Sequence, residues 1–203
     1  MATGGEAKDR LEAIVLAAGA GARFGGGKLL APWRDGVLLD GALAAAFAAP
    51  VRGASVVWGA DARIAEAAMA FATRVGKADR LRLVHAADHA AGLSQSLKAG
   101  VESLPPNAAG AFVFLGDMPR IPAGVLAPLA EALAAGAAAA APVFAGRRGH
   151  PVLFGAALFH ALAGLSGDRG AGELLGRLGD HLARITAPDD GVLYDVDRPQ
   201  DLA

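Results

Sequence analysis

A glycine-rich stretch with two cationic side chains is the part of this sequence best suited to bind phosphate. It follows a short apolar run at residues 13–17, which has the length of a buried strand. Glycine permits a backbone with positive φ, and successive N–H groups in such a loop can bind an anion. Arg23 lies within the stretch and Lys28 follows it, and both pair well with phosphate oxygens. Residues 18–28 therefore predict a triphosphate site rather than an ordinary surface turn.

Two well-known phosphate-binding loops do not fit this stretch. A Walker A loop needs glycine at position 22 and a hydroxyl group after the lysine, but the chain has Ala22 and Leu29 there. The dinucleotide-binding fingerprint needs its third glycine at position 24, which is Phe24. Both motifs are therefore excluded.

Aspartates in two later segments are candidate metal ligands. Asp117 follows an apolar run at 112–115, and Mg²⁺ usually takes one or two carboxylates together with phosphate oxygens and water. The alternative is that Asp117 only caps the next turn. Asp195 and Asp197 lie at a predicted strand over 192–196, so their side chains should point to one face. Asp197 could instead cap a helical turn.

Polar residues in two further segments could contact a ligand. Ser94 and Ser96 fall at the start of a predicted helix, where free N–H groups favour an anion or a polar base edge. The simpler interpretation is that Ser94 is a helix cap. Arg148 and His150 precede a predicted strand and form a cationic rim, which could equally be a solvated loop.

The elements that must position these residues alternate along the chain. Predicted strands cover residues 13–17, 55–58, 81–85, 111–115, 138–143, 151–154 and 192–196. Predicted helices cover residues 40–49, 61–72, 94–102, 122–135, 155–163 and 171–178, and a hairpin turn is expected at 35–36. This alternation predicts an α/β fold, a three-layer α/β/α sandwich with a mostly parallel sheet. In such sheets, ligands bind at the carboxyl ends of the strands.

Composition narrows the class of protein further. The 203 residues suffice for one domain, expected at 11–203 after a disordered tail at 1–10 that has no secretory signal. The absence of cysteine excludes disulfides and thiolate metal sites, and no apolar run is long enough for a membrane span. A net charge of −1 argues against a nucleic-acid partner. We expect a cytoplasmic protein without membrane association.

Several motifs resemble those of the small nucleotidyltransferases that mature the molybdenum cofactor. Residues 16–30 are similar to their signature loop, and Ala17-Ala18-Gly19 is closer to the cytidylyltransferase branch than to the guanylyltransferase branch, which tends to have Ala-Gly-Gly. Further similarities are Gly116-Asp117-Met118-Pro119, the segment around Ser94, Gly149-His150-Pro151 and the ending from Asp195. The resemblance thus spans about residues 12–202. One departure is Gly172, which stands where the family has an arginine.

The resemblance implies a Rossmann-like nucleotidyltransferase fold and a Mg²⁺-dependent reaction. CMP would pass from CTP to the terminal phosphate of a molybdopterin-type cofactor, with release of pyrophosphate. The implied catalytic residues are Arg23, Lys28 and Asp117, and the implied metal ligands are Asp117 and Asp197. The implied nucleotide-binding residues are Leu16, Ala17, Ala18, Gly19, Gly21, Arg23, Lys28, Ser94 and Ser96. The implied substrate-binding residues are His150, Arg148, Asp168 and Asp195.

Other functions fit the same residues. The nucleotide could be GTP, or the acceptor another phosphorylated metabolite. A carrier protein that delivers the cofactor to a molybdoenzyme is a non-enzymatic alternative, but a pure carrier needs no magnesium carboxylate. For an enzyme, a molybdoenzyme or its chaperone would be a transient partner.

Overall fold

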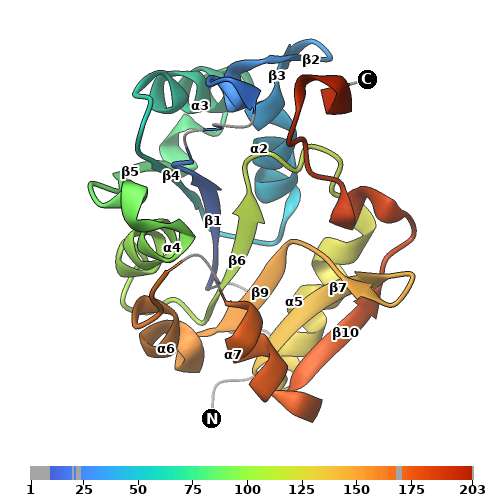
Figure 1. Ribbon diagram of the computed structural model, residues 1–203. Coiled ribbons are helices and arrows are strands. Elements are labelled where there is room, and N and C mark those ends of the chain that lie inside the picture. The colour runs from blue at the N-terminus through green and yellow to red at the C-terminus, as the bar shows by residue number, and fades with distance from the viewer. Residues whose placement is uncertain (1–9, 20, 22–23, 168–170, 203) are drawn as a thin grey trace.

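The computed structural model describes residues 10–19, 21, 24–167 and 171–202. One sheet runs through this part of the chain in the order β10-β7-β9-β6-β1-β4-β5, with the short strand β8 beside β7 (Figure 1). Its strands are β1 Leu11–Ala17, β4 Ala54–Trp58, β5 Leu81–His85, β6 Gly110–Leu115, β7 Ala139–Phe144, β8 Arg147–Arg148, β9 Val152–Gly155 and β10 Leu182–Thr186. Strand β1 pairs in parallel with both β4 and β6, whereas β9 is antiparallel to β6 and β7. The prediction of a mostly parallel sheet is confirmed.

Helices cover both faces of the sheet, which confirms the three-layer prediction (Figure 1). Helices α2 Leu38–Ala48, α3 Arg63–Arg74 and α5 Leu126–Ala134 pack on one face, and α4 Leu93–Glu102, α6 Phe159–Ala163 and α7 Gly172–Arg177 on the other. Because side chains alternate along a strand, Ala13 and Val15 contact the first group while Ile14 and Leu16 contact the second. This two-sided burial explains why β1 is a continuous apolar run apart from Glu12.

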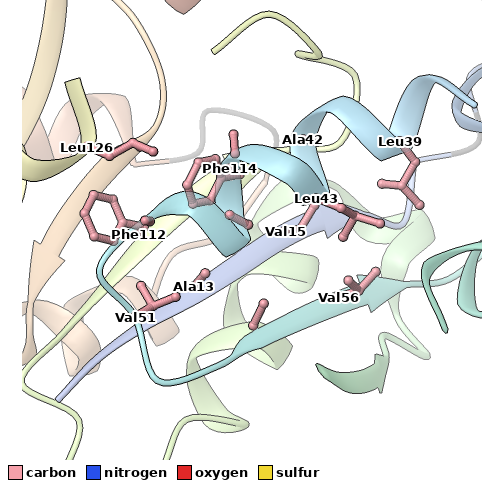
Figure 2. Packing of buried hydrophobic residues seen from close by; sticks show 14 of the residues in the cluster. Ala13, Val15, Leu39, Ala42, Leu43, Val51, Val56, Phe112, Phe114 and Leu126 are labelled. Carbon is pink, nitrogen blue, oxygen red and sulfur yellow. The ribbon is translucent and has the colours of Figure 1, made fainter. Parts of the chain in front are cut away.

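Large apolar side chains fix α2 on the sheet. Phe112 and Phe114 of β6 are fully buried and lie in one cluster with Leu39 and Leu43 of α2 (Figure 2). Fully burying a leucine or phenylalanine side chain contributes about 1.5–3 kcal/mol to folding. The strand that leads to Asp117 is therefore held firmly against the helix that follows the glycine-rich stretch.

Short elements connect these layers. The predicted hairpin is present as β2 Pro32–Trp33 paired with β3 Gly36–Val37. Short 3-10 helices are η2 Lys28–Leu30, η3 Ala78–Arg80, η4 His89–Ala91, η5 Ala123–Val125, η6 Ala156–Leu158, η7 Gly179–His181, η8 Asp190–Leu193 and η9 Pro199–Leu202. No helix in the described ranges is both long and apolar enough to cross a bilayer.

The prediction of a strand over 192–196 is wrong. These residues form the end of η8 and an extended segment without ladder partners, and the strand at this end of the sheet is β10 instead. Val192 and Val196 are both fully buried, so their apolar character comes from packing on the core rather than from a strand. Strand β10 was missed because it is a half-exposed edge strand that includes Arg184 and Thr186.

A buried ionic network joins the strands at the end of the sheet opposite the glycine-rich stretch. Glu12 is 1% exposed, and its two carboxylate oxygens accept hydrogen bonds from Arg52 Nε at 2.8 Å and Arg82 Nη2 at 2.6 Å. Arg82 also donates to Ser55 Oγ at 3.1 Å. The single polar residue of β1 thus ties it to β4, to β5 and to the segment before β4.

Candidate active site

The glycine-rich stretch leaves β1 and turns back on itself. Its glycines at 21, 25, 26 and 27 have φ values of 61°, 89°, 94° and 63°, in the region that residues with a β-carbon rarely adopt. The N–H groups of Phe24 and Gly26 both donate to the carbonyl oxygen of Gly21, at 2.9 and 3.2 Å. The turn delivers Lys28 to the start of η2. Arg23, predicted to be catalytic, lies outside the described residues.

Asp117 stands just beyond the carboxyl end of β6. The ladder between β6 and β1 continues past the strand, because the Gly116 N–H donates to the carbonyl oxygen of Leu16 at 2.9 Å. A β-carbon on Gly116 would lie 3.1 Å from that oxygen, so glycine allows β6 to stay close to β1 here. The Asp117 carboxylate therefore emerges at the centre of the sheet, beside the glycine-rich stretch.

Lys28 connects the aspartates of the two segments. Its Nζ lies 2.6 Å from Asp117 Oδ2 and 3.5 Å from Asp197 Oδ1, and its side chain is only 13% exposed. The two predicted metal ligands and one predicted catalytic cation are thus brought together. We call Lys28, Asp117 and Asp197 the carboxylate–lysine cluster.

The C-terminal segment reaches the cluster through a backbone hydrogen bond. The Val196 N–H donates to the carbonyl oxygen of Asp117 at 3.0 Å, and the Val196 side chain is fully buried. The pKa of Asp195 is raised, first by partial loss of solvent and then by the nearby charges of Asp197 and Asp117. Asp195 and Asp197 therefore both lie near Asp117, although no strand holds them there. The turn after Asp197 is capped by Asp201, whose Oδ2 accepts from the N–H groups of Asp197 and Arg198.

Two adjoining cavities lie beside the cluster. One of about 220 Å³ is lined by Leu16, Ala17, Gly19, Gly21, Lys28, Leu29, Leu93, Leu115 and Asp117. The other, of about 380 Å³, shares Gly19 and Lys28 with the first and extends to Asp61 and Arg63. Arg63 donates to the Asp61 carboxylate, with Nη2 at 2.7 Å from Oδ2. Arg63 was not among the residues predicted to lie at the site, and the available signal was its place just beyond β4, the strand beside β1.

The two serines predicted to contact a nucleotide are buried in α4. Ser94 is 0% and Ser96 4% exposed, and the Oγ of Ser94 has no hydrogen-bond partner among the described atoms. Their neighbour Leu93 lines the smaller cavity instead. Ala18, also predicted to contact the nucleotide, is 3% exposed at the end of β1.

A third cavity, of about 260 Å³, lies where β6 meets the antiparallel strand β9. We call it the apolar pocket. Its wall contains Leu16, Leu93, Leu97, Val113, Leu115, Arg148, Gly149, His150, Val152, Phe154, Ala171, Gly172 and Leu175. Two predicted substrate-binding residues, Arg148 and His150, thus share this pocket, while a third, Asp168, lies outside the described residues.

Burial favours the neutral form of the His150 side chain. Burial, together with the positive charge of Arg148, lowers its pKa, while a hydrogen bond with the Val113 backbone and the charge of Asp117 oppose the shift. Its Nδ1 has no hydrogen-bond partner among the described atoms. The backbone holds the residue in place, since the His150 N–H donates to the carbonyl oxygen of Val192 at 2.9 Å.

The donor set of the cluster suits a hard divalent cation that brings ligands of its own. Among the described residues, no group of three or more His, Cys, Asp or Glu side chains could hold a metal ion. Two carboxylates beside a glycine-rich stretch nevertheless match the usual share of protein ligands to Mg²⁺ when a phosphate supplies the rest. The site is thus suited to a metal–triphosphate complex.

A doubly covered α/β sheet with these groups at the carboxyl ends of β1 and β6 is an arrangement suited to nucleotidyl transfer. The MobA-like NTP transferase domain matches residues 13–182, and the chain belongs to this family. The comparison with curated proteins found no match.

Solved structures share the fold over nearly the whole chain. The homolog of Mycobacterium tuberculosis Rv0371c from Mycobacterium sp. strain JC1 is 34% identical, with a TM-score of 0.77 over 95% of this chain and 92% of that one. Rv0371c from M. tuberculosis H37Rv is 28% identical over 95% of both chains, with a TM-score of 0.78, and it has also been solved in complex with manganese. A nucleotidyl transferase from Methanothermobacter thermautotrophicus, 24% identical with a TM-score of 0.74 over 95% of this chain and 94% of that one, shares the fold.

Proposed function

We propose that this nucleotidyltransferase transfers CMP from CTP to the terminal phosphate of a molybdopterin-type molybdenum cofactor. The observation that carries the proposal is the carboxylate–lysine cluster, which lies beside the glycine-rich stretch in a chain of the MobA-like family. The motifs that resemble the cytidylyltransferase branch supply the choice of nucleotide and acceptor.

The reaction forms one phosphorus–oxygen bond and breaks another. A terminal phosphate oxygen of the acceptor attacks the α-phosphorus of CTP, and the bond from that phosphorus to the bridging oxygen breaks as pyrophosphate leaves. The attacking phosphate is already ionised at neutral pH, since its second pKa is about 6, so no strong base is needed. Catalysis then depends on alignment and on neutralising charge. Lys28, Arg23 and the N–H groups around Gly19 and Gly21 would supply the positive charge and the donors.

Asp117 and Asp197 would hold the divalent metal, which we propose to be Mg²⁺. When bound, the metal neutralises charge on the phosphate oxygens. The manganese complex of Rv0371c supports the use of a divalent metal, because Mn²⁺ and Mg²⁺ share a preference for oxygen ligands. The paired carboxylates of the cluster are the ligands that such ions prefer.

The proposed preference for CTP rests on the end of β1. Leu16, Ala17 and Gly19 line the smaller cavity, and Ala18 lies between them in the chain with its side chain buried in the core. We propose that its β-carbon limits the room left for the base. A pyrimidine needs less room than a purine. Ser94 and Ser96 would act through the first turn of α4, where Ser94 Oγ has no described partner.

The apolar pocket is the proposed site for the acceptor. Its apolar walls suit a flat ring, neutral His150 can accept a hydrogen bond, and Arg148 can pair with a negative group. Asp168 and Asp195 complete the proposed substrate contacts. A β-carbon on Gly172 would lie 3.8 Å from Arg148 Nη2, so Arg148 can supply a cation near the position where the family has an arginine.

One observation favours a second candidate function, the transfer of CMP to another phosphorylated metabolite. Gly172 replaces the family's arginine, so an acceptor contact made by that arginine is missing here. This candidate keeps the same nucleotide site and differs only in the occupant of the apolar pocket.

Pyrophosphate release with each of the four nucleoside triphosphates, with and without molybdopterin, tests both functions. We expect release with CTP that depends on molybdopterin, and a loss of orders of magnitude in Asp117→Asn with the fold intact. Release that prefers GTP would overturn the choice of nucleotide. Release that does not respond to molybdopterin but responds to another phosphorylated acceptor would favour the second candidate. Near-normal turnover in Asp117→Asn would refute the role of Asp117.

A further inference from the structure

The ammonium group of Lys28 lies within reach of both carboxylates that we propose as metal ligands. Its Nζ is 2.6 Å from Asp117 Oδ2 and 3.5 Å from Asp197 Oδ1. Lys28 is 13% and Asp117 24% exposed, so water and salt screen this ion pair less than they would screen a surface pair. A free divalent ion that approaches Asp117 therefore meets a cation already in position.

The cavities around Lys28 offer its side chain a second position. Lys28 lines both cavities beside the glycine-rich stretch, and its four-carbon side chain carries a mobile point charge. A triphosphate in those cavities would offer the ammonium group new oxygen partners. Gly21 packs closely on Lys28, because a β-carbon at residue 21 would lie 3.0 Å from Lys28 Cβ. The rotatable bonds of the lysine side chain allow the ammonium group to move without a change in this packing.

We propose that Lys28 is a stand-in cation, which holds Asp117 and Asp197 together in the free enzyme and releases them to a divalent metal only when a triphosphate arrives. This inference rests on the proposed function, because it assumes that the cluster serves a metal–triphosphate complex. It adds an order to binding, in which the metal enters with the nucleotide and binds weakly without it. The enzyme thereby avoids trapping a metal ion that has no substrate.

The structure supports this coupling in two ways. The described residues contain no cluster of three or more metal-binding side chains, so a lone ion finds few ligands. A +1 charge within a few ångströms of a +2 ion also repels it, even where the effective dielectric constant is about 20 or higher. The shortage of ligands and the repulsion would both be removed if phosphate oxygens supplied further ligands and paired with the ammonium group of Lys28. By reciprocity, the metal must strengthen nucleotide binding by the same factor.

Manganese binding measured without turnover tests the proposal. Free Mn²⁺ is counted by electron paramagnetic resonance during titration of wild type, Lys28→Met, Lys28→Arg and Lys98→Met, with and without an unreactive CTP analogue. Lys98 is a matched control, because its loss removes the same charge from an exposed pair with Glu102. We expect Lys28→Met to bind Mn²⁺ alone about tenfold more tightly than wild type, by loss of the local repulsion. Lys28→Arg and Lys98→Met should resemble wild type, and the analogue should tighten Mn²⁺ binding far more in wild type than in Lys28→Met.

Two results would overturn the proposal. One is a folded Lys28→Met variant that binds free Mn²⁺ no more tightly than wild type. The other result needs no variant. If wild type binds Mn²⁺ equally tightly with and without the CTP analogue, metal binding and triphosphate binding are not coupled. If instead Mn²⁺ binding behaves as expected but CTP and molybdopterin give no pyrophosphate, the proposed acceptor reaction fails while the role of Lys28 stands.

Discussion

Replacing Gly41 by alanine should displace Asp117, the proposed metal ligand, through the contact of residue 41 with Pro119. Gly41 lies inside α2 and packs on Pro119, two residues after Asp117. A β-carbon at Gly41 would lie 2.6 Å from the Cα, the Cβ and the carbonyl oxygen of Pro119, closer than real contacts allow. Two of these three atoms belong to the backbone, so relief requires movement of α2 or of the loop that carries Asp117.

The expected size follows from two opposed effects. Alanine in a helix interior is favoured over glycine by about 1 kcal/mol. Overpacking in a tightly packed core costs about 1–3 kcal/mol, and the upper part of that range applies because backbone must shift. We therefore expect Gly41→Ala to lower the free energy of unfolding by about 1–2 kcal/mol. Displacement of Asp117 should also reduce turnover by about tenfold or more, because catalysis depends on alignment.

Urea denaturation and pyrophosphate release from CTP measure the two effects. The matched control is Gly176→Ala in α7, where a β-carbon meets nothing within 4 Å, so only the favourable helix term applies. Gly176→Ala should be as stable as wild type or more stable, with unchanged turnover. A Gly41→Ala variant with wild-type stability and turnover would refute the argument that α2 positions Asp117.

Three further substitutions test other parts of the molecule. Glu12→Ala should lower the free energy of unfolding by about 2 kcal/mol, since two charge-assisted hydrogen bonds are lost while Arg52 and Arg82, 34% and 38% exposed, can regain water. The control Glu102→Ala removes a carboxylate from an exposed ion pair and should change the free energy of unfolding little. Equal effects of the two substitutions would contradict the stabilising role of the Glu12 network. Ala18→Gly should narrow the preference for CTP over GTP in kcat/KM by about 1–3 kcal/mol, and a wild type that prefers GTP would overturn the choice of nucleotide. The pKa of His150 is lowered in the folded state, so as pH falls below about 6.5 this imidazole takes up a proton in the unfolded chain but not in the folded one. The free energy of unfolding should therefore decrease over that range more steeply in wild type than in His150→Gln, and identical slopes would show that His150 is not responsible.

The sequence was sufficient to predict the part of the fold that is buried on both sides. Strands such as β1 and β6 read as apolar runs because helices cover both faces of the sheet, and Asp117 could be placed at the end of one of them. Strand β10 could not be recognised in the same way, because it lies at the sheet edge and exposes part of its side chains. The last strand was predicted at residues 192–196 instead, because Val192 and Val196 are apolar, although they are buried by packing on the core outside any strand.

The residues of the candidate site were easier to identify than their contacts. Residue types, spacing and the family resemblance predicted Lys28, Asp117 and Asp197, but the ion pairs between them join segments far apart in the chain, and the hydrogen bond from Val196 to Asp117 that accompanies them is encoded by no local pattern. Ser94 shows the opposite difficulty. Its position at a helix start was predicted, but the helix turns its side chain into the core and exposes Leu93 to the cavity, and this depends on the packing of α4.

The antiparallel strand β9 brings the second half of the chain to the apolar pocket. The described residues that line the two cavities beside the glycine-rich stretch all precede Met118. The wall of the apolar pocket is shared, because Leu16, Leu93 and Leu115 precede Met118 whereas Arg148 and His150 follow it. In evolutionary terms, recombination near Met118 could exchange one wall of the proposed acceptor pocket and keep the proposed nucleotide site. The constraint on such a chimera is that its second half must still bring an aspartate to Asp117. We expect a hybrid that meets this condition to take its nucleotide from one parent and its acceptor from the other.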